Sequence, residues 1–137
     1  MYPAEIIAPM TRDLTIAGFE PLETPEQVIN VLEEQKGTSL LVVNSVCGCA
    51  AAMARPGVKM ALNNDKQPNK LYTVFAGVDR EATEKAREYL LPYPPSSPSI
   101  ALFKDGKLVH FIERHHIEGR SASMIAENLK AAFNEYC

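Results

Sequence analysis

The apolar positions of this chain follow two spacings, which predict two kinds of element. Apolar residues three and four positions apart predict helices over residues 4–17, 25–36, 50–62, 80–89 and 121–136. Shorter apolar runs predict strands over residues 39–46, 71–76, 100–103 and 108–112, and a short extended piece over residues 19–22. The run Leu40-Leu41-Val42-Val43 has no polar interruption, which is typical of a central strand covered on both faces.

Turn and capping residues mark where several of these elements begin and end. Residues 24–27, with the sequence TPEQ, form a capping-box pattern that predicts a helix start, and Gly37 is a natural stop for that helix. Asp79 is suited to cap the helix over residues 80–89. Inside the third helical stretch we expect a kink or a break at Pro56, because proline lacks a backbone N–H. Asp105-Gly106 between two strands predicts a two-residue hairpin.

Helices and strands alternate along most of the chain, and an antiparallel pair of strands comes near its end. This order predicts an α/β fold with a central mixed β-sheet flanked by helices on both faces, together with an added N-terminal helix. The length of 137 residues fits one domain, and neither a repeat nor a linker divides it. We therefore expect a single domain over residues 1–137.

Composition and charge narrow the classes of function. The net charge of −3 argues against nucleic-acid binding, which usually shows a basic stripe. No apolar run approaches the ~20 residues that span a bilayer, and the first residues lack the basic start of a signal peptide. We therefore expect a cytoplasmic protein with no membrane partner. In that reducing compartment a close cysteine pair is more often catalytic or metal-binding than structural.

The candidate chemistry lies at Cys47-Gly48-Cys49, between the central strand and an alanine-rich helix. The thiolate is the form that attacks disulfides, and a helix N-terminus stabilises it through unpaired N–H groups and the helix dipole. Gly48 has no side chain, so a bulky thiol can approach the sulfur of Cys47. Cys49 is close enough to form a disulfide with Cys47 or to share a metal ion with it. The pattern predicts a thiol–disulfide oxidoreductase.

Two other interpretations of the cysteines stay open at this point. Both could be buried in a turn of small residues, since free cysteine is among the most buried residue types. They could also bind a metal together with histidine, although none of the usual paired spacings is present. For the other candidate side chains we expect a half-exposed strand position for His110, a solvated turn for His115 and His116, a surface charge for Arg55 and a frayed, exposed terminus for Cys137.

The stretch from Ser97 to Gly106 resembles the part of thioredoxin-like proteins that carries a cis-proline just before an antiparallel hairpin. A strand that leads into a cysteine motif at a helix N-terminus is the other half of that arrangement. The resemblance implies a thioredoxin-like fold, a cis Ser97–Pro98 bond and a Pro98 that faces Cys47. The chain departs from thioredoxin by having one residue between the cysteines instead of two, and no tryptophan before them.

A narrower resemblance, to bacilliredoxins of the Cys-Gly-Cys type, covers nearly the whole chain. It rests on residues 43–51, 54–56, 75–77, 95–99 and 118–119, which read VNSVCGCAA, ARP, FAG, PSSPS and EG. Bacilliredoxins remove bacillithiol from proteins that carry it as a mixed disulfide, and family members have also been described as disulfide isomerases.

The bacilliredoxin resemblance implies roles for five residues. Cys47 and Cys49 are the expected catalytic residues, with Cys47 as attacker and Cys49 as helper, and Gly48, Ser97 and Pro98 are the expected substrate contacts. The implied partners are bacillithiolated client proteins, bacillithiol as co-substrate, and a separate bacillithiol disulfide reductase. The resemblance implies neither a metal nor a tightly bound cofactor.

Overall fold

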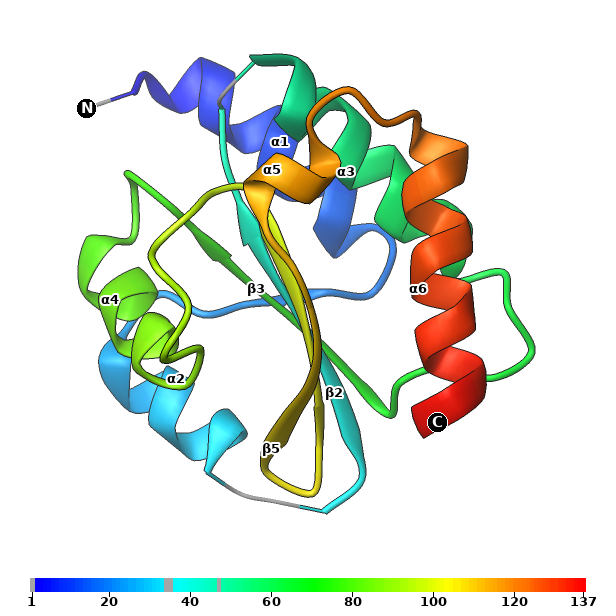
Figure 1. The fold of residues 1–137 in the computed structure, drawn as a ribbon. Coiled ribbons are helices and arrows are strands. Elements are labelled where there is room, and N and C mark those ends of the chain that lie inside the picture. The colour runs from blue at the N-terminus through cyan, green and yellow to red at the C-terminus, as the bar shows by residue number, and fades with distance from the viewer. Residues whose placement is uncertain (1, 34–35, 47) are drawn as a thin grey trace.

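The computed structural model describes residues 2–33, 36–46 and 48–137 of the chain (Figure 1). Within these residues the helices are α1 (Ala4–Thr15), α2 (Pro25–Leu32), α3 (Gly48–Ala61), α4 (Arg80–Glu88), α5 (Arg114–Ile117) and α6 (Ala122–Tyr136). The strands are β1 (Glu20–Pro21), β2 (Thr38–Asn44), β3 (Lys70–Phe75), β4 (Ser99–Lys104) and β5 (Lys107–Ile112). The predicted elements are therefore present in the predicted order, with α5 as an addition.

One mixed sheet runs through the middle of the molecule, with strand order β1-β3-β2-β4-β5. β1 and β2 lie parallel to β3, whereas β4 runs antiparallel to both β2 and β5. The central place of β2 follows from its sequence. Leu40 and Val42 point into one apolar cluster and Leu41 and Val43 into the other, so both faces of this strand are covered.

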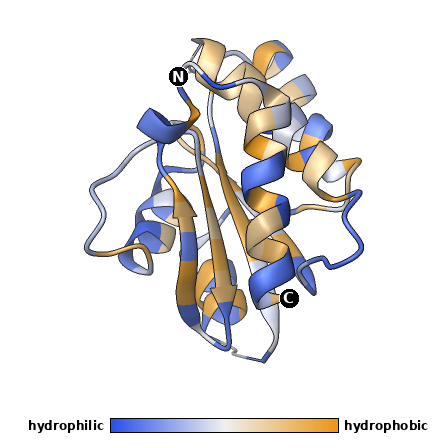
Figure 2. Ribbon diagram, turned by 45° about the vertical axis from the view of Figure 1, so that its right-hand side comes forward, coloured by the Kyte–Doolittle hydropathy of each residue, from blue (hydrophilic) through white to orange (hydrophobic). Residues whose placement is uncertain are grey.

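Helices cover both faces of the sheet, as the sequence predicts. α1, α3 and α6 lie over one face, with Leu14, Val58 and Phe133 among their buried residues, and α2 and α4 lie over the other with Val28 and Ala82 (Figure 1). Figure 2 shows the same division by hydropathy, with apolar strands between helices whose outer sides are polar. The α/β fold with a central mixed sheet is thus confirmed.

Several local signals also act as predicted. Thr24 accepts a hydrogen bond from the Gln27 N–H, and the Gln27 side chain accepts one from the Thr24 N–H, which completes the capping box of α2. Asp105 and Gly106 both have positive φ, 47° and 86°, as a type I′ hairpin turn requires. The peptide bond between Ser97 and Pro98 is cis.

Gly37 does not end α2, contrary to the prediction. The helix ends at Leu32, before Gly37 is reached. The Gly37 N–H instead donates to Oδ1 of Asp105 at 2.9 Å, and the Gly37 carbonyl accepts from the Asp105 N–H at 2.9 Å. The glycine, with φ of 83°, therefore joins the start of β2 to the β4–β5 hairpin turn. That partner lies 68 positions away, which local pattern cannot reveal.

At Pro56 a break, one of the two predicted alternatives, is absent, and the turn predicted at His115 and His116 is a short helix. α3 continues through Pro56 from Gly48 to Ala61, so proline does not break it; α6 packs closely along the same stretch, at Gly57. His115 and His116 lie in the short helix α5 and not in a turn. The ring of His116 accepts the Glu113 N–H at 3.1 Å and so caps the helix start, a role that the usual Glu or Gln pattern would not predict.

Asp79 occupies the N-cap position of α4, but its side chain makes no capping hydrogen bond. The first-turn carbonyl contact is made by Thr83, whose hydroxyl donates to the Asp79 carbonyl at 2.8 Å. Partial burial, and then the charge of Glu23, raise the pKa of the Asp79 carboxyl. The predicted helix start is therefore right, while the predicted capping interaction is not present.

Candidate functional site

The candidate site lies where the central strand β2 ends and α3 begins. β2 ends at Asn44, Ser45 follows it, and both are buried with 2% of their surface exposed. α3 begins at Gly48. Cys47 lies outside the residues that the structure describes, so its predicted position at the helix N-terminus stays a prediction. What the structure gives is the geometry on both sides of it.

The first turn of α3 is open to solvent. Gly48 has a φ of 54°, a left-handed conformation that favours glycine. Apart from its chain neighbours and the nearby backbone of α3, no described atom lies within 4 Å of where a Cβ would stand. Cys49 is also exposed. The interpretation of two buried cysteines is therefore wrong for Cys49. The open space at Gly48 is what an approaching substrate sulfur would need.

The cis bond before Pro98 lies at the same end of the sheet. In the antiparallel pairing of β2 and β4, Val43 is opposite Ser99, and this register carries Pro98 to the level of Asn44, where β2 ends. Pro98 is buried and Ser97 is half-buried. The structure thus brings Ser97 and Pro98 together with the strand end that leads to Gly48 and Cys49.

Arg114, which the sequence reasoning did not single out, holds the segment before Pro98. Its Nη1 donates to the Ser97 carbonyl at 2.9 Å, and its backbone N–H donates to Oγ of Ser96 at 3.4 Å. The Ser99 hydroxyl donates to the Ser96 carbonyl at 3.1 Å. Arg114 belongs to α5, so this unpredicted helix connects the end of β5 to the cis-proline segment.

Arg55 is not the surface charge that the sequence predicted. Only 12% of its side chain is exposed, and its Nη1 donates to the Ser45 carbonyl at 2.8 Å and to Oδ1 of Asn44 at 3.1 Å. Burial lowers the pKa of the Arg55 guanidinium, and the charge of Asp13 partly offsets this. The sequence does contain a signal for this contact. A long helical side chain points toward the helix N-terminus, and here that direction leads to the end of β2.

Asn44 ties the same strand end to the N-terminal helix. Its Nδ2 donates to the Met10 carbonyl of α1 at 3.2 Å. Its Oδ1 accepts both from Arg55 and from the Ser45 N–H, the latter at 2.9 Å. One buried amide therefore joins α1, β2 and α3 next to the candidate site.

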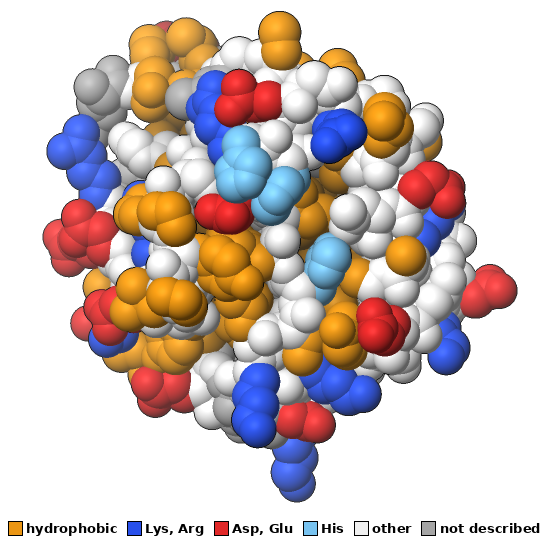
Figure 3. Space-filling model, in the orientation of Figure 1, with side chains coloured by type: hydrophobic (Ala, Val, Ile, Leu, Met, Phe, Trp, Pro, Cys, Tyr) orange, Lys and Arg blue, Asp and Glu red, His pale blue; other side chains and the backbone are white. Residues whose placement is uncertain are grey.

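The histidines gather on one face of the molecule (Figure 3). His110 is half-buried on β5, as predicted, with Nε2 2.6 Å from Oδ1 of Asn128. Possible metal-ligand atoms of Glu113, His115 and His116 lie within 4.8 Å of one another. This group, found among the residues that the structure describes, contains no cysteine. Nδ1 of His116 already accepts the Glu113 N–H. A metal site that includes Cys47 falls outside what the structure describes.

Cys137 is exposed at the end of α6, as predicted, but it is not frayed. Its N–H donates to the Phe133 carbonyl at 2.8 Å, which continues the helical hydrogen bonding to the last residue. It lies at the C-terminal end of α6, and Cys49 lies in the first turn of α3 (Figure 1).

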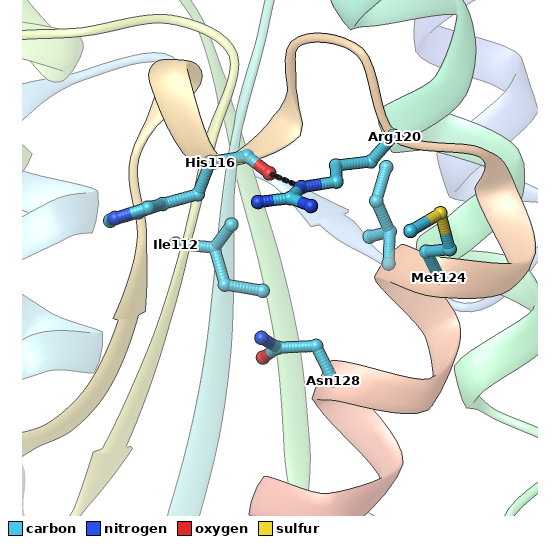
Figure 4. A pocket seen from close by; sticks show the side chains of 6 residues that line it. Ile112, His116, Arg120, Met124 and Asn128 are labelled. Carbon is cyan, nitrogen blue, oxygen red and sulfur yellow. Dashed lines mark hydrogen bonds between the residues drawn. The ribbon is translucent and has the colours of Figure 1, made fainter.

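A cavity of about 340 Å³ lies between α5, α6 and the end of β5 (Figure 4). The Arg120 side chain extends across it, and its Nε donates to the His116 carbonyl at 3.4 Å. None of the predicted catalytic or substrate-contacting residues lines it; its lining residues are Ile112, His116, Arg120, Met124, Ile125 and Asn128.

Solved structures with a similar fold include thioredoxins. The thioredoxin of Malassezia sympodialis matches with a TM-score of 0.60 and 15% identity, over 87% of this chain and 90% of that one. The cis-proline at the start of β4 and the exposed cysteine in the first turn of α3 lie at one end of this fold. The chain is therefore a protein of the thioredoxin fold, as the first resemblance implied.

The chain belongs to the bacilliredoxin family, a group of thiol–disulfide oxidoreductases. The family model described as disulphide isomerase matches residues 2–137. A bacilliredoxin of Cytophaga hutchinsonii is 62% identical over 135 residues, which cover 98% of this chain and 99% of the relative. A bacilliredoxin of Halalkalibacterium halodurans is 53% identical over 99% of this chain and 94% of its own length. Among the residues described, no helix is both long and apolar enough to cross a membrane.

Proposed function

We propose that this oxidoreductase removes bacillithiol from S-bacillithiolated proteins, with Cys47 as the attacking thiol. The observation that carries the proposal is the exposed Gly48-Cys49 turn at the start of α3, level with the cis Ser97–Pro98 bond. The near full-length identity of 62% to a protein named bacilliredoxin supports bacillithiol as the thiol concerned. The cytoplasm, where thiols are kept reduced, is the compartment in which this activity is expected.

The reaction is a sequence of thiolate attacks on disulfides. The Cys47 thiolate attacks the bacillithiol sulfur of the mixed disulfide, and the client sulfur leaves as a thiolate that takes up a proton. Bacillithiol is then bound to Cys47. Either the thiolate of a second bacillithiol attacks the bound bacillithiol sulfur and leaves as bacillithiol disulfide, which releases the Cys47 thiolate, or the Cys49 thiolate attacks the Cys47 sulfur, forms the Cys47–Cys49 disulfide and releases bacillithiol. In the second case two further bacillithiols reduce the Cys47–Cys49 disulfide and leave as bacillithiol disulfide. A separate reductase recycles the bacillithiol disulfide, and no tightly bound cofactor takes part.

The start of α3 favours the first attack. The first N–H groups of a helix have no partner within it, so those near Cys49 and Ala50 can stabilise a negative sulfur together with the helix dipole. The absence of a side chain at Gly48 leaves room for the substrate disulfide. Because Pro98 has no N–H, regular strand pairing stops there, and backbone groups beside it stay available for an extended client segment.

Intact-mass measurement after exposure to bacillithiol disulfide tests the assignment. Cys47→Ala is expected to prevent the adduct and the removal of bacillithiol from a client, whereas Cys49→Ala is expected to trap the adduct on Cys47. Cys137→Ala is the matched control, since that cysteine lies at the C-terminal end of α6 and outside the motif at residues 47–49. This variant is expected to behave as the wild type. An adduct found only on Cys49 would reverse the roles of the two residues.

A second candidate activity is the isomerisation of protein disulfides. The description of the matching family model, disulphide isomerase, favours it. Refolding of a scrambled disulfide protein and release of bacillithiol from a client, measured with the same enzyme preparation, separate the two activities. Rapid refolding without bacillithiol release would favour the isomerase.

A further inference from the structure

We propose that Arg55 is a positioning residue of the bacilliredoxin site, which holds the segment before Cys47 and brings a positive charge to it. This inference rests on the proposed function in one respect, the role of Cys47 as the attacking thiol. It adds a residue that neither the cysteine motif nor the family resemblance identifies as functional.

Arg55 contacts the end of β2 and the residue after it through two hydrogen bonds. It lies about two helical turns after the start of α3, and its guanidinium reaches back to the Ser45 carbonyl at 2.8 Å. The same Nη1 donates to Oδ1 of Asn44 at 3.1 Å, and that oxygen also accepts the Ser45 N–H. Ser45 therefore has both its N–H and its carbonyl engaged by one small network. These bonds fix the backbone of Ser45 on both sides of its Cα.

The network also reaches the N-terminal helix. Nε of Arg55 lies 3.8 Å from Oδ2 of Asp13, and Asn44 donates to the Met10 carbonyl. Lys59, one turn further along α3, forms a second ion pair with Asp13. α1 is thus part of the frame that holds the candidate site, which gives the added N-terminal helix a function beyond covering the sheet.

The charge of Arg55 is maintained at neutral pH, since a guanidinium is not deprotonated in proteins. Because only 12% of the side chain is exposed, water screens this charge less than it would at the surface. Asp13 compensates part of it, but Asp13 also pairs with Lys59. A positive charge near a thiol favours the thiolate, so the arrangement is expected to lower the pKa of Cys47.

Other charged groups near this end of α3 come from α5, which packs against it. Arg114 faces the Ser97 carbonyl and Glu118, and α5 also carries His115 and His116. α6 meets α3 through apolar contacts at Gly57 and Ile125. The pH profile of Cys47 is therefore also recorded with His115 and His116 both changed to Asn, so that any contribution of these two side chains is removed.

The test is the pH dependence of alkylation of Cys47 by iodoacetamide. In a Cys49→Ala/Cys137→Ala background Cys47 is the only thiol, because the chain has three cysteines. We expect Arg55→Gln to raise the midpoint and to slow alkylation about three- to tenfold below it, the effect of losing one nearby charge. Arg55→Lys keeps the charge and is expected to restore part of the rate. Arg120→Gln is the matched control, since Arg120 also donates to a backbone carbonyl but is exposed and outside the network.

Asp13→Asn gives the opposite sign and covers the case in which Arg55→Gln does not fold. It removes a negative charge beside Arg55, so the midpoint is expected to fall. An unchanged midpoint in Arg55→Gln, or an unchanged or higher one in Asp13→Asn, overturns the proposal. Iodoacetamide needs no bacillithiol, so these results stand apart from the activity. Failure to form the bacillithiol adduct would refute the proposed function, while the alkylation profiles would still decide the role of Arg55.

Discussion

The contact between α3 and α6 leads to a sharp prediction for the stability of the helix that carries the candidate site. A Cβ added at Gly57 would lie 2.9 Å from both Cβ and Cγ2 of Ile125 and 3.1 Å from the Ala122 carbonyl oxygen. Carbon atoms in good contact are about 3.5–4.0 Å apart. The atoms concerned belong to a branched side chain close to its backbone and to the backbone itself, so they cannot rotate away. Gly57→Ala must therefore push the two helices apart.

Two opposing terms set the size of the effect. Alanine is favoured over glycine inside a helix by about 1 kcal/mol. Forcing an extra methyl into a packed contact costs about 1–3 kcal/mol. We expect the packing term to win and the free energy of unfolding to fall by about 1 kcal/mol. Ala52→Gly, at an exposed position of the same helix, measures the propensity term by itself.

Urea unfolding followed by far-UV circular dichroism gives both free energies. The packing term is the stability lost in Gly57→Ala plus the stability lost in Ala52→Gly, because the first change gains the propensity that the second removes. A value of about 2 kcal/mol is expected. If Gly57→Ala gains as much stability as Ala52→Gly loses, the packing term is zero and the reasoning from the close contact of α3 and α6 is refuted.

Three further changes test other parts of the structure. Thr24→Ala removes the cap of α2 and is expected to cost about 1 kcal/mol in urea unfolding; no loss would show that the cap does not contribute. Arg114→Gln frees the Ser97 carbonyl and is expected to raise KM for a bacillithiolated client more than it lowers kcat; an unchanged KM would contradict this. Partial burial and a hydrogen bond to Glu33 raise the pKa of Tyr89 to about 12. Its contribution to stability is therefore complete below about pH 10 and is lost as the pH rises toward 12. Tyr89→Phe should reduce that loss in unfolding experiments between about pH 10 and the raised pKa of about 12. An identical decline in both proteins would exclude the tyrosine as its cause.

The fold was predictable because its determinants are short-range and repeated. The uninterrupted run Leu40-Leu41-Val42-Val43 is divided evenly between the two apolar clusters, and this alone requires helices on both faces of β2. The capping box at Thr24 and the turn at Asp105-Gly106 each depend on residues within four positions. Each of these signals is independent of the others, and all of them agree with one fold. The mixed sheet could therefore be predicted from them.

Two of the errors, at Gly37 and at Arg55, come from contacts with residues distant in the chain. Gly37 is the residue type that commonly ends a helix, yet its backbone hydrogen bonds are made with Asp105. Arg55 follows an alanine-rich run and directly precedes Pro56. The sequence predicts a surface charge there, yet the side chain contacts Asp13, Asn44 and Ser45 from other parts of the chain. The cap at His116 was not predicted for another reason. Its geometry is local, but the capping-box pattern assigns Glu or Gln, and not histidine, to that position.

Arg55, predicted to be a surface charge, and Arg114, which the sequence did not single out, have roles that share one physical cause. Ser45 and Ser97 each lie just outside a strand, next to the residues expected to react or to bind the client. Their carbonyls therefore lie beyond the regular hydrogen bonding of the sheet. A buried carbonyl without a partner costs about 1–3 kcal/mol. Arg55 and Arg114 each supply a charged donor to one of these carbonyls. A site built where a central strand ends needs such donors from elsewhere in the chain. The cysteine motif therefore indicates the chemistry, while the residues that hold it in place become visible only once α3 and α5 are set beside the sheet.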